Sequence, residues 1–502
     1  MARIDSKPGL LAAAQQLSAL RDADPSQAIT EARKLEGRGR WQASVRSLRA
    51  GILIDAGVAD RDPTAVREGV TICRRLVRKS KDNLGLVYNL ANGLCSQARL
   101  AFVPGKGWAN WYSETHVLRR DARVLFARAS RAGGSLRAKA LINLGNELDA
   151  GFRWVEAYDR WVEAIQADPA NGVSTLSIAS MLSRRIVSHK HGEALHRVAG
   201  YYARMAARNV QSIRDIAGPD ASRVVKRLPT FRSTWRPRKV AKLCNDYGRF
   251  VALNRLALVG TVEGLDLRRR RWDDVHVKGI GVESGKAIPS VFAMINQLKA
   301  DYCTARWLAY LGIQDAIPET AVYVDTLDYA RYGTSSSGLV LAQRAALDVL
   351  DRVAVCANDY FRCGLKPQEI CFAEFWRHNG GTGRWAPYLG TELESGNPGV
   401  VALGELAADL SEGALLNVAR SIRNIGTHRF HTVYDESVPP SSAAIQRHDV
   451  QQFEAEALRS LQIARSAILY LLDAIEFRER TDGDGDRGLT IPLPSHDWVR
   501  GR

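Results

Sequence analysis

The sequence predicts an all-α protein with two helical regions. Apolar residues recur at three- and four-residue spacings along most of the 502-residue chain, paired helices repeat through its first half, and long amphipathic stretches fill its second half. Hydrophobic residues make up 46% of the chain, which is enough for a sizeable core. We expect a helical solenoid over 1–228, a basic linker over 229–242, a helical domain over 243–480 and a flexible tail over 481–502.

The clearest helix pair runs from Ala138 to Pro169. Its two predicted helices each carry one apolar or small-residue stripe, formed by Leu141, Leu144, Gly145 and Leu148 and then by Ala157, Trp161 and Ala164. Small residues on such stripes allow antiparallel helices to approach closely. Large, small and aromatic residues in these places, over about 34 residues, resemble a tetratricopeptide repeat. Leu148 departs from that pattern, because an aromatic residue is commoner there.

Looser helix pairs flank this unit. One pair is predicted over 41–57 and 64–80, and another over 83–102 and 113–130. Single units of this kind cannot bury their apolar faces alone, so several must stack into a short solenoid. The usual role of such a solenoid is to present a concave surface to a protein or peptide partner. The alternative is that it only packs against the C-terminal half.

The second half changes to longer helices without the repeat pattern. We predict helices over 246–260, 289–312 and 337–361, two helical stretches between 399 and 430, and a long final helix over 444–480. The segment 319–333 is less regular, and we expect a short extended piece in it. The break around Pro229 and Pro237 disfavours helix.

The chain is strongly basic. Its formal net charge is +16, from 70 Lys and Arg against 54 Asp and Glu, and arginine supplies most of the positive charge. Arginine suits bidentate contact with phosphate, which favours an anionic partner such as RNA. An arginine-rich composition without a binding role is the alternative. The segment 232–239 and the run Arg268–Arg271 mix cations with tryptophan, so each is either a surface for single-stranded RNA or a solvated linker.

Several function classes are excluded or disfavoured. No apolar run is long enough to cross a bilayer, the N-terminus lacks a secretory signal, and the seven cysteines are scattered, so we expect a cytoplasmic protein without membrane contact. No Walker A, Rossmann or G-x-S-x-G motif is present, and we expect no cofactor. His189, His191 and His196 are interpreted as a surface turn, and the acidic segment from Asp482 lacks calcium-loop spacing, so we also expect no metal.

One helix of the C-terminal half carries a candidate catalytic face. Leu415, Ala419, Ile422 and Gly426 form one predicted stripe of this helix. At about 100° per residue, Asn424 and His428 fall on the opposite face and Arg423 flanks them. Asn424 and His428 are four residues apart and can touch. The helix therefore buries one face and points Arg, Asn and His outward.

These three side chains suit metal-independent RNA cleavage. A neutral imidazole takes or gives a proton near physiological pH, and a guanidinium holds a phosphate and stabilises charge that develops on it. The 2′-hydroxyl of RNA would attack the adjacent phosphate with their assistance. One His can hardly act as both base and acid in a single step, so we expect a second copy from a two-fold symmetric dimer.

The run from Arg423 to His428 fits the R-polar-x3-H signature, and the helical region around it resembles a large HEPN domain (higher eukaryotes and prokaryotes nucleotide-binding) over about Leu243 to Arg480. Such domains are often joined to tetratricopeptide repeats. The resemblance implies a helical bundle that dimerises into one composite ribonuclease site, with Arg423 and His428 catalytic and Asn424 supporting.

The resemblance also implies a prokaryotic defence or toxin-type role. Six arginines are the expected RNA contacts: Arg420, Arg429, Arg268, Arg269, Arg270 and Arg271. Some HEPN toxins carry a modifiable Tyr two residues after the His, but this chain has Phe430 there, which puts that control in doubt. The alternative is a non-catalytic adaptor, in which the repeats bind a protein and the HEPN domain dimerises or binds a nucleotide.

Overall fold

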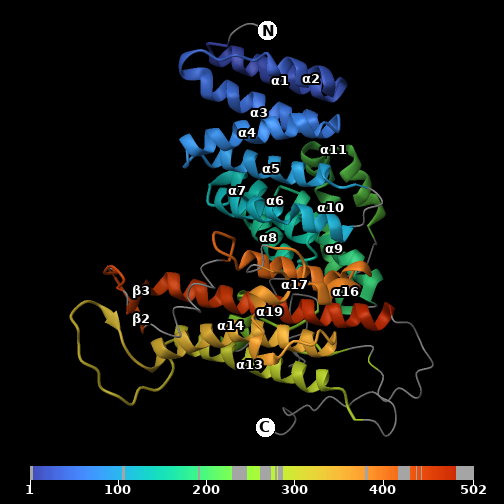
Figure 1. Cartoon of the computed structure of the whole chain (residues 1–502). Helices are drawn as coiled ribbons and strands as arrows, with labels where there is room; N and C mark the ends of the chain where they lie inside the picture. The colour runs from blue at the N-terminus through green and yellow to red at the C-terminus, as the bar shows by residue number, and fades with distance from the viewer. Residues whose placement is uncertain are drawn as a thin grey trace. The chain divides into compact units, whose positions relative to one another are not determined.

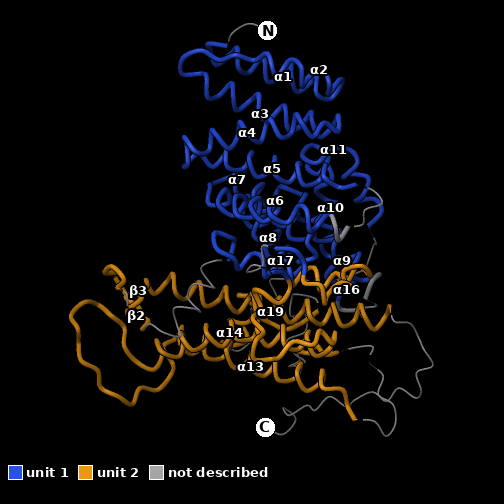
Figure 2. Tube along the Cα trace, in the orientation of Figure 1, with its two compact units in different colours: residues 1–236, 377–385, 404–417 blue, residues 237–376, 386–403, 418–502 orange. Residues whose placement is uncertain are grey.

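The computed structural model describes residues 4–103, 108–189, 193–228, 246–260, 273–277, 280, 287–378, 383–416, 430–436, 438–442 and 444–481. The chain divides into two compact units. Unit 1 comprises residues 1–236, 377–385 and 404–417, and unit 2 comprises 237–376, 386–403 and 418–502 (Figure 2). The two short segments of the second half that belong to unit 1 were not indicated by the sequence patterns.

Unit 1 is a series of helices in which each packs against the next along the chain (Figure 1). The predicted helix pairs are confirmed. The helices are α1 (Lys7–Ala23), α2 (Pro25–Arg33), α3 (Gln42–Ala59), α4 (Pro63–Lys79), α5 (Leu84–Leu100), α6 (Trp108–Ala129), α7 (Gly134–Ala150), α8 (Trp154–Ala167), α9 (Val173–His189), α10 (Glu193–Arg208) and α11 (Val210–Arg227).

Short polar residues start several of these helices. Asp62 accepts hydrogen bonds from the backbone N–H groups of Thr64 and Ala65 at the start of α4, and Asn83 accepts one from Leu86 at the start of α5. Such caps satisfy backbone donors that have no partner within the helix. The caps fix where one helix of a pair ends and the next begins, which sets the repeat length.

The interface between α7 and α8 depends on a glycine. A Cβ added at Gly145 would lie 2.5 Å from Trp161 Nε1, so the indole occupies the space that a side chain would need. Trp161 is 1% exposed and its Nε1 donates to the carbonyl of Ile142 and to Asn146 Oδ1. The predicted close approach at Gly145 is therefore confirmed.

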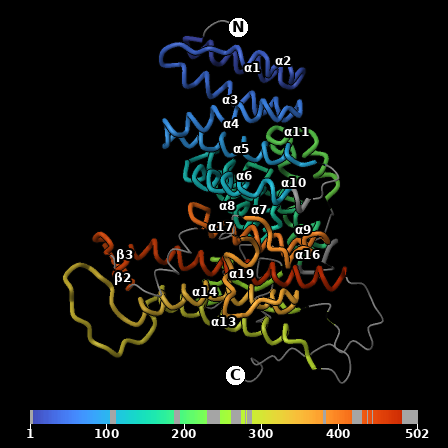
Figure 3. The backbone as a smooth tube through the Cα atoms, viewed as in Figure 1, coloured from blue at the N-terminus to red at the C-terminus, as the bar shows by residue number. Residues whose placement is uncertain are grey.

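Unit 2 is built around three long helices that pack against one another, α13 (Ser290–Ile313), α14 (Thr334–Tyr360) and α19 (Val450–Thr481). The other elements of this half are α12 (Asp246–Leu253), β1 (Ala330–Arg331), α15 (Phe372–Phe375), α16 (Gly390–Glu394), β2 (Phe430–Tyr434) and β3 (Ile445–Asp449). Helix α17 (Pro398–Asp409) begins in unit 2 and ends in unit 1. The course of the backbone is shown in Figure 3.

A small sheet lies at one end of the long helices of unit 2. The strand order is β1-β2-β3, with β1 antiparallel to β2 and β2 parallel to β3, in a register that pairs Phe430 with Ile445 and Tyr434 with Asp449. The extended piece expected in 319–333 is confirmed as β1. It places the irregular segment beside the strand that follows the R-polar-x3-H signature.

Two predicted helix boundaries and one predicted surface turn are wrong. The final helix begins at Val450 instead of 444, because residues 445–449 pair with β2 and Asp449 caps the helix by accepting a hydrogen bond from the N–H of Gln452. The helix predicted over 246–260 ends at Leu253, because Arg255 adopts a φ of 52°. His189 and His196 lie in α9 and α10, not in a turn, and His191 lies outside the described residues.

Candidate functional site

The residues of the predicted catalytic face lie outside the described part of the chain. This holds for Arg423, Asn424 and His428. It holds equally for the expected RNA contacts, which are Arg420, Arg429, Arg268, Arg269, Arg270 and Arg271. The structure describes the chain up to Leu416 before the signature and from Phe430 after it. The contacts of these two flanks are described below.

The segment before the signature departs from the predicted stripe. Leu415 lies in a turn and not in a helix, because α17 ends at Asp409 and Gly413 takes a φ of 71°. The N–H of Leu416 returns to donate to the carbonyl of Asp409 at 2.7 Å. Ala419, Ile422 and Gly426, the other members of that stripe, lie outside the described residues.

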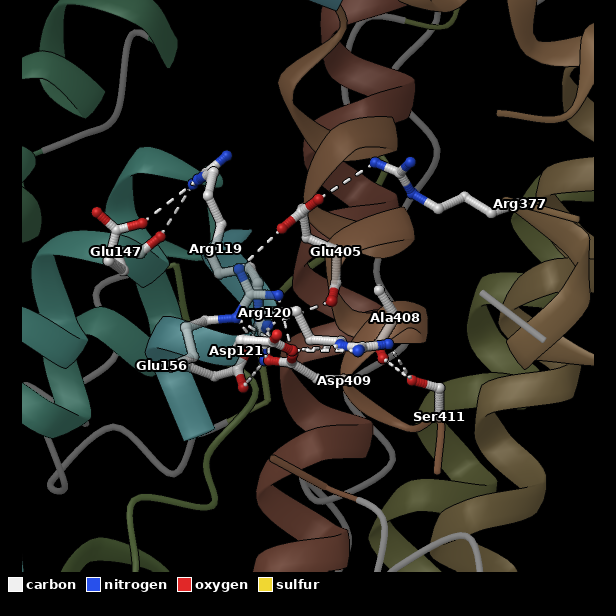
Figure 4. A network of polar contacts seen from close by, with 12 residues as sticks. Arg119, Arg120, Asp121, Glu147, Glu156, Arg377, Glu405, Ala408, Asp409 and Ser411 are labelled. Carbon is white, nitrogen blue, oxygen red and sulfur yellow. Dashed lines mark hydrogen bonds and ion pairs between the residues drawn. The ribbon is translucent and has the colours of Figure 1, made fainter. Parts of the chain in front are cut away.

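The end of α17 is held in unit 1 by a buried ionic cluster, which we call the α17 anchor (Figure 4). It joins three arginines to three carboxylates: Arg123, Arg153, Arg377, Glu156, Glu405 and Asp409. Arg123 lies on α6, Arg153 directly precedes α8, and Glu405 and Asp409 lie one turn apart on α17. All but Glu156 have side chains that are 0% exposed.

The hydrogen bonds of the α17 anchor are dense. Arg123 donates from Nε and Nη2 to both oxygens of Asp409 at 2.8–3.1 Å, and from Nη1 to Glu405 Oε2 at 2.9 Å. Arg153 donates to Asp409 Oδ2 and to both oxygens of Glu156. Charged groups this deeply buried are tolerated only when they are paired and hydrogen-bonded. Separation of the end of α17 from the repeats would therefore leave buried charged side chains without their ion-pair partners.

Two pKa values follow from this burial. Burial alone would raise the pKa of Glu405, but Arg123, Arg119 and Arg377 lower it to about 2. Burial lowers the pKa of Arg377 to about 10, although its contact with Glu405 acts in the opposite sense. The guanidinium of Arg377 also lies 3.7 Å from the ring centroid of Trp385. Both groups stay charged at neutral pH, so the ion pair between Arg377 and Glu405 persists throughout the physiological range.

The flank after the signature carries a histidine pair. His431 on β2 and His448 on β3 stack with ring centroids 5.1 Å apart, and His431 Nδ1 lies 3.0 Å from His448 Nε2. Burial lowers the pKa of His448 to about 4, helped by His431, and burial and Arg344 lower the pKa of His431. Both imidazoles are neutral at pH 7, so one ring nitrogen donates to the other. The sequence predicts no role for His431, and the structure gives it a partner.

Arg306, on one of the helices that carry the HEPN resemblance, is a structural residue. It donates to both oxygens of Asp273 at 2.9 and 2.7 Å, to the carbonyl of Leu256 and to Tyr247 Oη. Although burial alone would raise the pKa of Asp273, these hydrogen bonds hold it below its ordinary value. Arg306 thereby ties α13 to α12 and to the chain that precedes α13.

The described residues contain neither a candidate metal cluster nor a candidate membrane span. Among them, no group of three or more His, Cys, Asp or Glu side chains is arranged to hold a metal ion. None of the helices described is both long and apolar enough to span a bilayer.

The helical bundle of unit 2 and the R-polar-x3-H spacing agree with the class of HEPN domains. Residues 282–478 match the family model of LA2681-like HEPN domains, and this part of the chain is therefore an LA2681-like HEPN domain. The match includes α13, α14, most of α19 and the signature. No curated protein and no solved structure matches the chain. The tetratricopeptide character of the helices of unit 1 stays a prediction.

The contacts of the α17 anchor carry no sequence signal. Arg123 and Asp409 are 286 residues apart, and no local periodicity indicates that their two helices meet. The histidine pair had no signal in the sequence either, because His431 and His448 meet through the pairing of β2 with β3. Neither feature forms part of the R-polar-x3-H signature.

Proposed function

We propose that this protein is a metal-independent endoribonuclease effector of a prokaryotic defence or toxin-type system. One observation carries the proposal: the run from Arg423 to His428 has the R-polar-x3-H spacing and falls inside the region that matches the HEPN family. A HEPN domain is compatible with RNA cleavage or with nucleotide binding. The signature favours cleavage, because Arg and His supply the two functions that transesterification of RNA requires.

In the proposed reaction the 2′-hydroxyl of the substrate attacks the adjacent phosphorus and the 5′-oxygen of the next nucleotide leaves. His428 of one copy removes the hydroxyl proton, and the same residue of a second copy protonates the leaving oxygen. Arg423 stabilises the charge on the phosphoryl oxygens, and Asn424 orients these groups. No metal or cofactor is required by this scheme. The side chains proposed to contact the RNA backbone are Arg420, Arg429, Arg268, Arg269, Arg270 and Arg271.

The proposal needs a homodimer, and unit 2 carries a surface suited to one. Residues 319–332, which we call the apolar arm, loop out between α13 and α14 (Figure 1). Val322 is 100% exposed, and Val324 and Leu327 are each 84% exposed. Exposed apolar patches of several hundred Å² are uncommon on monomers and mark interaction sites. A two-fold dimer formed through this surface would bury the apolar arm of both copies.

The backbone of the apolar arm is held by hydrogen bonds at its base. The carboxylate of Glu319 accepts hydrogen bonds from the backbone N–H groups of Thr320, Ala321 and Thr334, and these bonds close its base. They also lower the pKa of Glu319 to about 2. Leu327 and Tyr329 hold positive φ values of 56° and 62°, which are unfavourable for such residues. A fixed arm with costly backbone angles supports a role in contact with a second copy.

The repeats are proposed to act as the sensor or partner-binding module. The α17 anchor supports this role, because Asp409 precedes Arg423 by only fourteen residues and is buried among the side chains of α6 and α8. A partner that displaces these helices would pull on the chain that leads into the signature. The anchor thus supports a role of the repeats in controlling the proposed catalytic residues.

RNA cleavage by the full-length protein in EDTA tests this proposal. We expect His428→Ala and Arg423→Ala each to reduce cleavage by about 10²–10⁴-fold without changing folding or dimerisation. His276→Ala is the matched control, because His276 is exposed and lies outside the HEPN match. Unchanged cleavage in both signature variants would remove the proposed site. Absence of cleavage from a correctly folded dimer would favour the non-catalytic adaptor.

A further inference from the structure

A basic groove lies on the repeats between α3 and α4. It has a volume of about 630 Å³. Its charged lining consists of five cations and one carboxylate: Arg46, Arg49, Arg75, Arg78, Lys79 and Glu68. The cations form two short rows, with Arg46 and Arg49 three residues apart on α3 and Arg75 and Arg78 three residues apart on α4. Residues at this spacing lie on one face of a helix, so both rows face the same groove.

The single carboxylate does not neutralise the groove. Glu68 already accepts hydrogen bonds from Arg49 Nη2 at 2.7 Å and from Arg33 Nε at 2.9 Å. Although burial alone would raise the pKa of Glu68, these arginines hold it below its ordinary value. Among the described residues, no carboxylate forms an ion pair with the other four cations of the groove. These four, Arg46, Arg75, Arg78 and Lys79, remain available to an anionic ligand.

A second cavity of about 560 Å³ continues the groove. Leu76 lines both cavities, so they adjoin across this residue. The lining of the second cavity includes small hydroxyl and amide side chains from α3, the α4–α5 turn, α5 and α7, namely Ser44, Ser47, Ser80, Asn83, Asn89 and Ser135. Neutral donors and acceptors of this kind contact phosphate and sugar oxygens in nucleic-acid complexes.

We propose that this groove binds the sugar–phosphate backbone of single-stranded RNA. Two rows of arginines match a ligand with evenly repeated negative charge, and arginine is the side chain best shaped for phosphate. The apolar side chains that line the first cavity are Ile72 and Leu76, against five cations, which favours an anionic ligand over the apolar anchors of a peptide. The groove adds a contact for RNA beyond the proposed catalytic site and does not depend on cleavage.

The test measures binding of an uncleavable strand to the full-length protein. A fluorescent deoxyuridine oligonucleotide keeps the phosphates but lacks the attacking 2′-hydroxyl, so binding is read without interference from cleavage. We expect Arg46→Ala/Arg75→Ala to weaken binding at least tenfold at low salt. The slope of log K against log salt should become shallower by about 1.4, because each phosphate contact with a single strand contributes about 0.7.

The matched control is Arg67→Ala/Arg74→Ala. Arg67 and Arg74 are exposed on α4, the second of them next to Arg75, but neither lines the groove. We expect the control to bind like the wild type. Equal losses in the two double variants, or no loss in either, would overturn the groove assignment.

A poly-glutamate peptide distinguishes RNA from an acidic protein as the ligand. If this peptide binds more strongly than the oligonucleotide, and if its binding is lost in the groove variant alone, the RNA assignment is overturned and the groove is a site for acidic protein. Loss of RNA cleavage in His428→Ala with intact oligonucleotide binding would separate the groove from the catalytic site.

Discussion

Arg123 and Asp409 form a fully buried, bidentate ion pair, although 286 residues separate them in the chain. The pair joins α6 of the repeats to the last turn of α17, and Arg153 completes it from α8. Asp409 belongs to the region that matches the HEPN family, whereas both arginines lie in the repeats. The segment that leads into the signature is therefore part of the repeat unit in structural terms.

Removal of Asp409 should destabilise the protein strongly. Asp409→Ala leaves Arg123 and Arg153 buried with too few acceptors, and breaking such a pair costs about 3–5 kcal/mol. We expect a loss of this size in the free energy of unfolding, measured by urea titration with tryptophan fluorescence. Arg223→Ala is the control, because Arg223 and Asp220 form a surface pair that is 69% and 86% exposed. Its loss should lie within about 0.5 kcal/mol, and equal losses in the two variants would contradict the anchor.

A methyl group at Gly145 should destabilise the repeats. Alanine normally stabilises a helix relative to glycine by up to about 1 kcal/mol. At Gly145, however, the new Cβ would meet the Trp161 indole at 2.5 Å, and overpacking of this kind costs about 1–3 kcal/mol. Gly51→Ala on α3 should do the reverse and stabilise, because no atom lies within 4 Å of its added Cβ. The melting temperature of each variant, measured by thermal unfolding, shows whether the substitution stabilises or destabilises the protein. Stabilisation by Gly145→Ala would contradict the packing described for α7 and α8.

Acid should destabilise unit 2 through the histidine pair. The unfolded chain takes up protons near the ordinary imidazole pKa of 6.5, whereas folded His448 does so only near 4. As the pH falls between these values, the unfolded chain binds more protons and stability is lost. His448→Gln cannot be protonated there, so its melting temperature should fall less than that of the wild type between about pH 7.5 and about pH 5. An identical fall in both proteins would show that His448 is not the titrating group.

Charge on the apolar arm should dissociate the proposed dimer. Val324→Asp/Leu327→Asp would place two carboxylates in the surface where a second copy is proposed to bind, and burying them unpaired is unfavourable. Sedimentation velocity should show a shift from dimer to monomer, with a parallel loss of RNA cleavage. Leu341→Asp is the control, since Leu341 is 53% exposed on α14 but lies outside the arm. A monomeric wild type, or a dimer that survives the double change, would refute the proposed contact.

Local sequence patterns predicted the helices whose apolar residues recur with a strong helical period. They failed at helix ends that are set by single residues. The pairs α3–α4, α5–α6 and α7–α8 were predicted from apolar stripes, because burying such a stripe requires a neighbouring helix. The start of α19 was missed because Asp449, a capping residue, and the pairing of β3 with β2 override the helical period of 445–449. The end of α12 was missed because a positive φ at Arg255 is set by surrounding structure and not by residue type.

By itself, the sequence determined the all-α class, the paired helices of the repeats and the R-polar-x3-H signature, because each depends on residues close together in the chain. Only the tertiary structure decided that Arg123 and Arg153 meet Asp409, that His431 has a partner in His448, and that Arg46 and Arg75 line one groove. These contacts depend on how distant helices and strands pack. A buried charged side chain is tolerated only where the fold places an opposite charge within hydrogen-bond distance. Local periodicity does not indicate where such a partner lies.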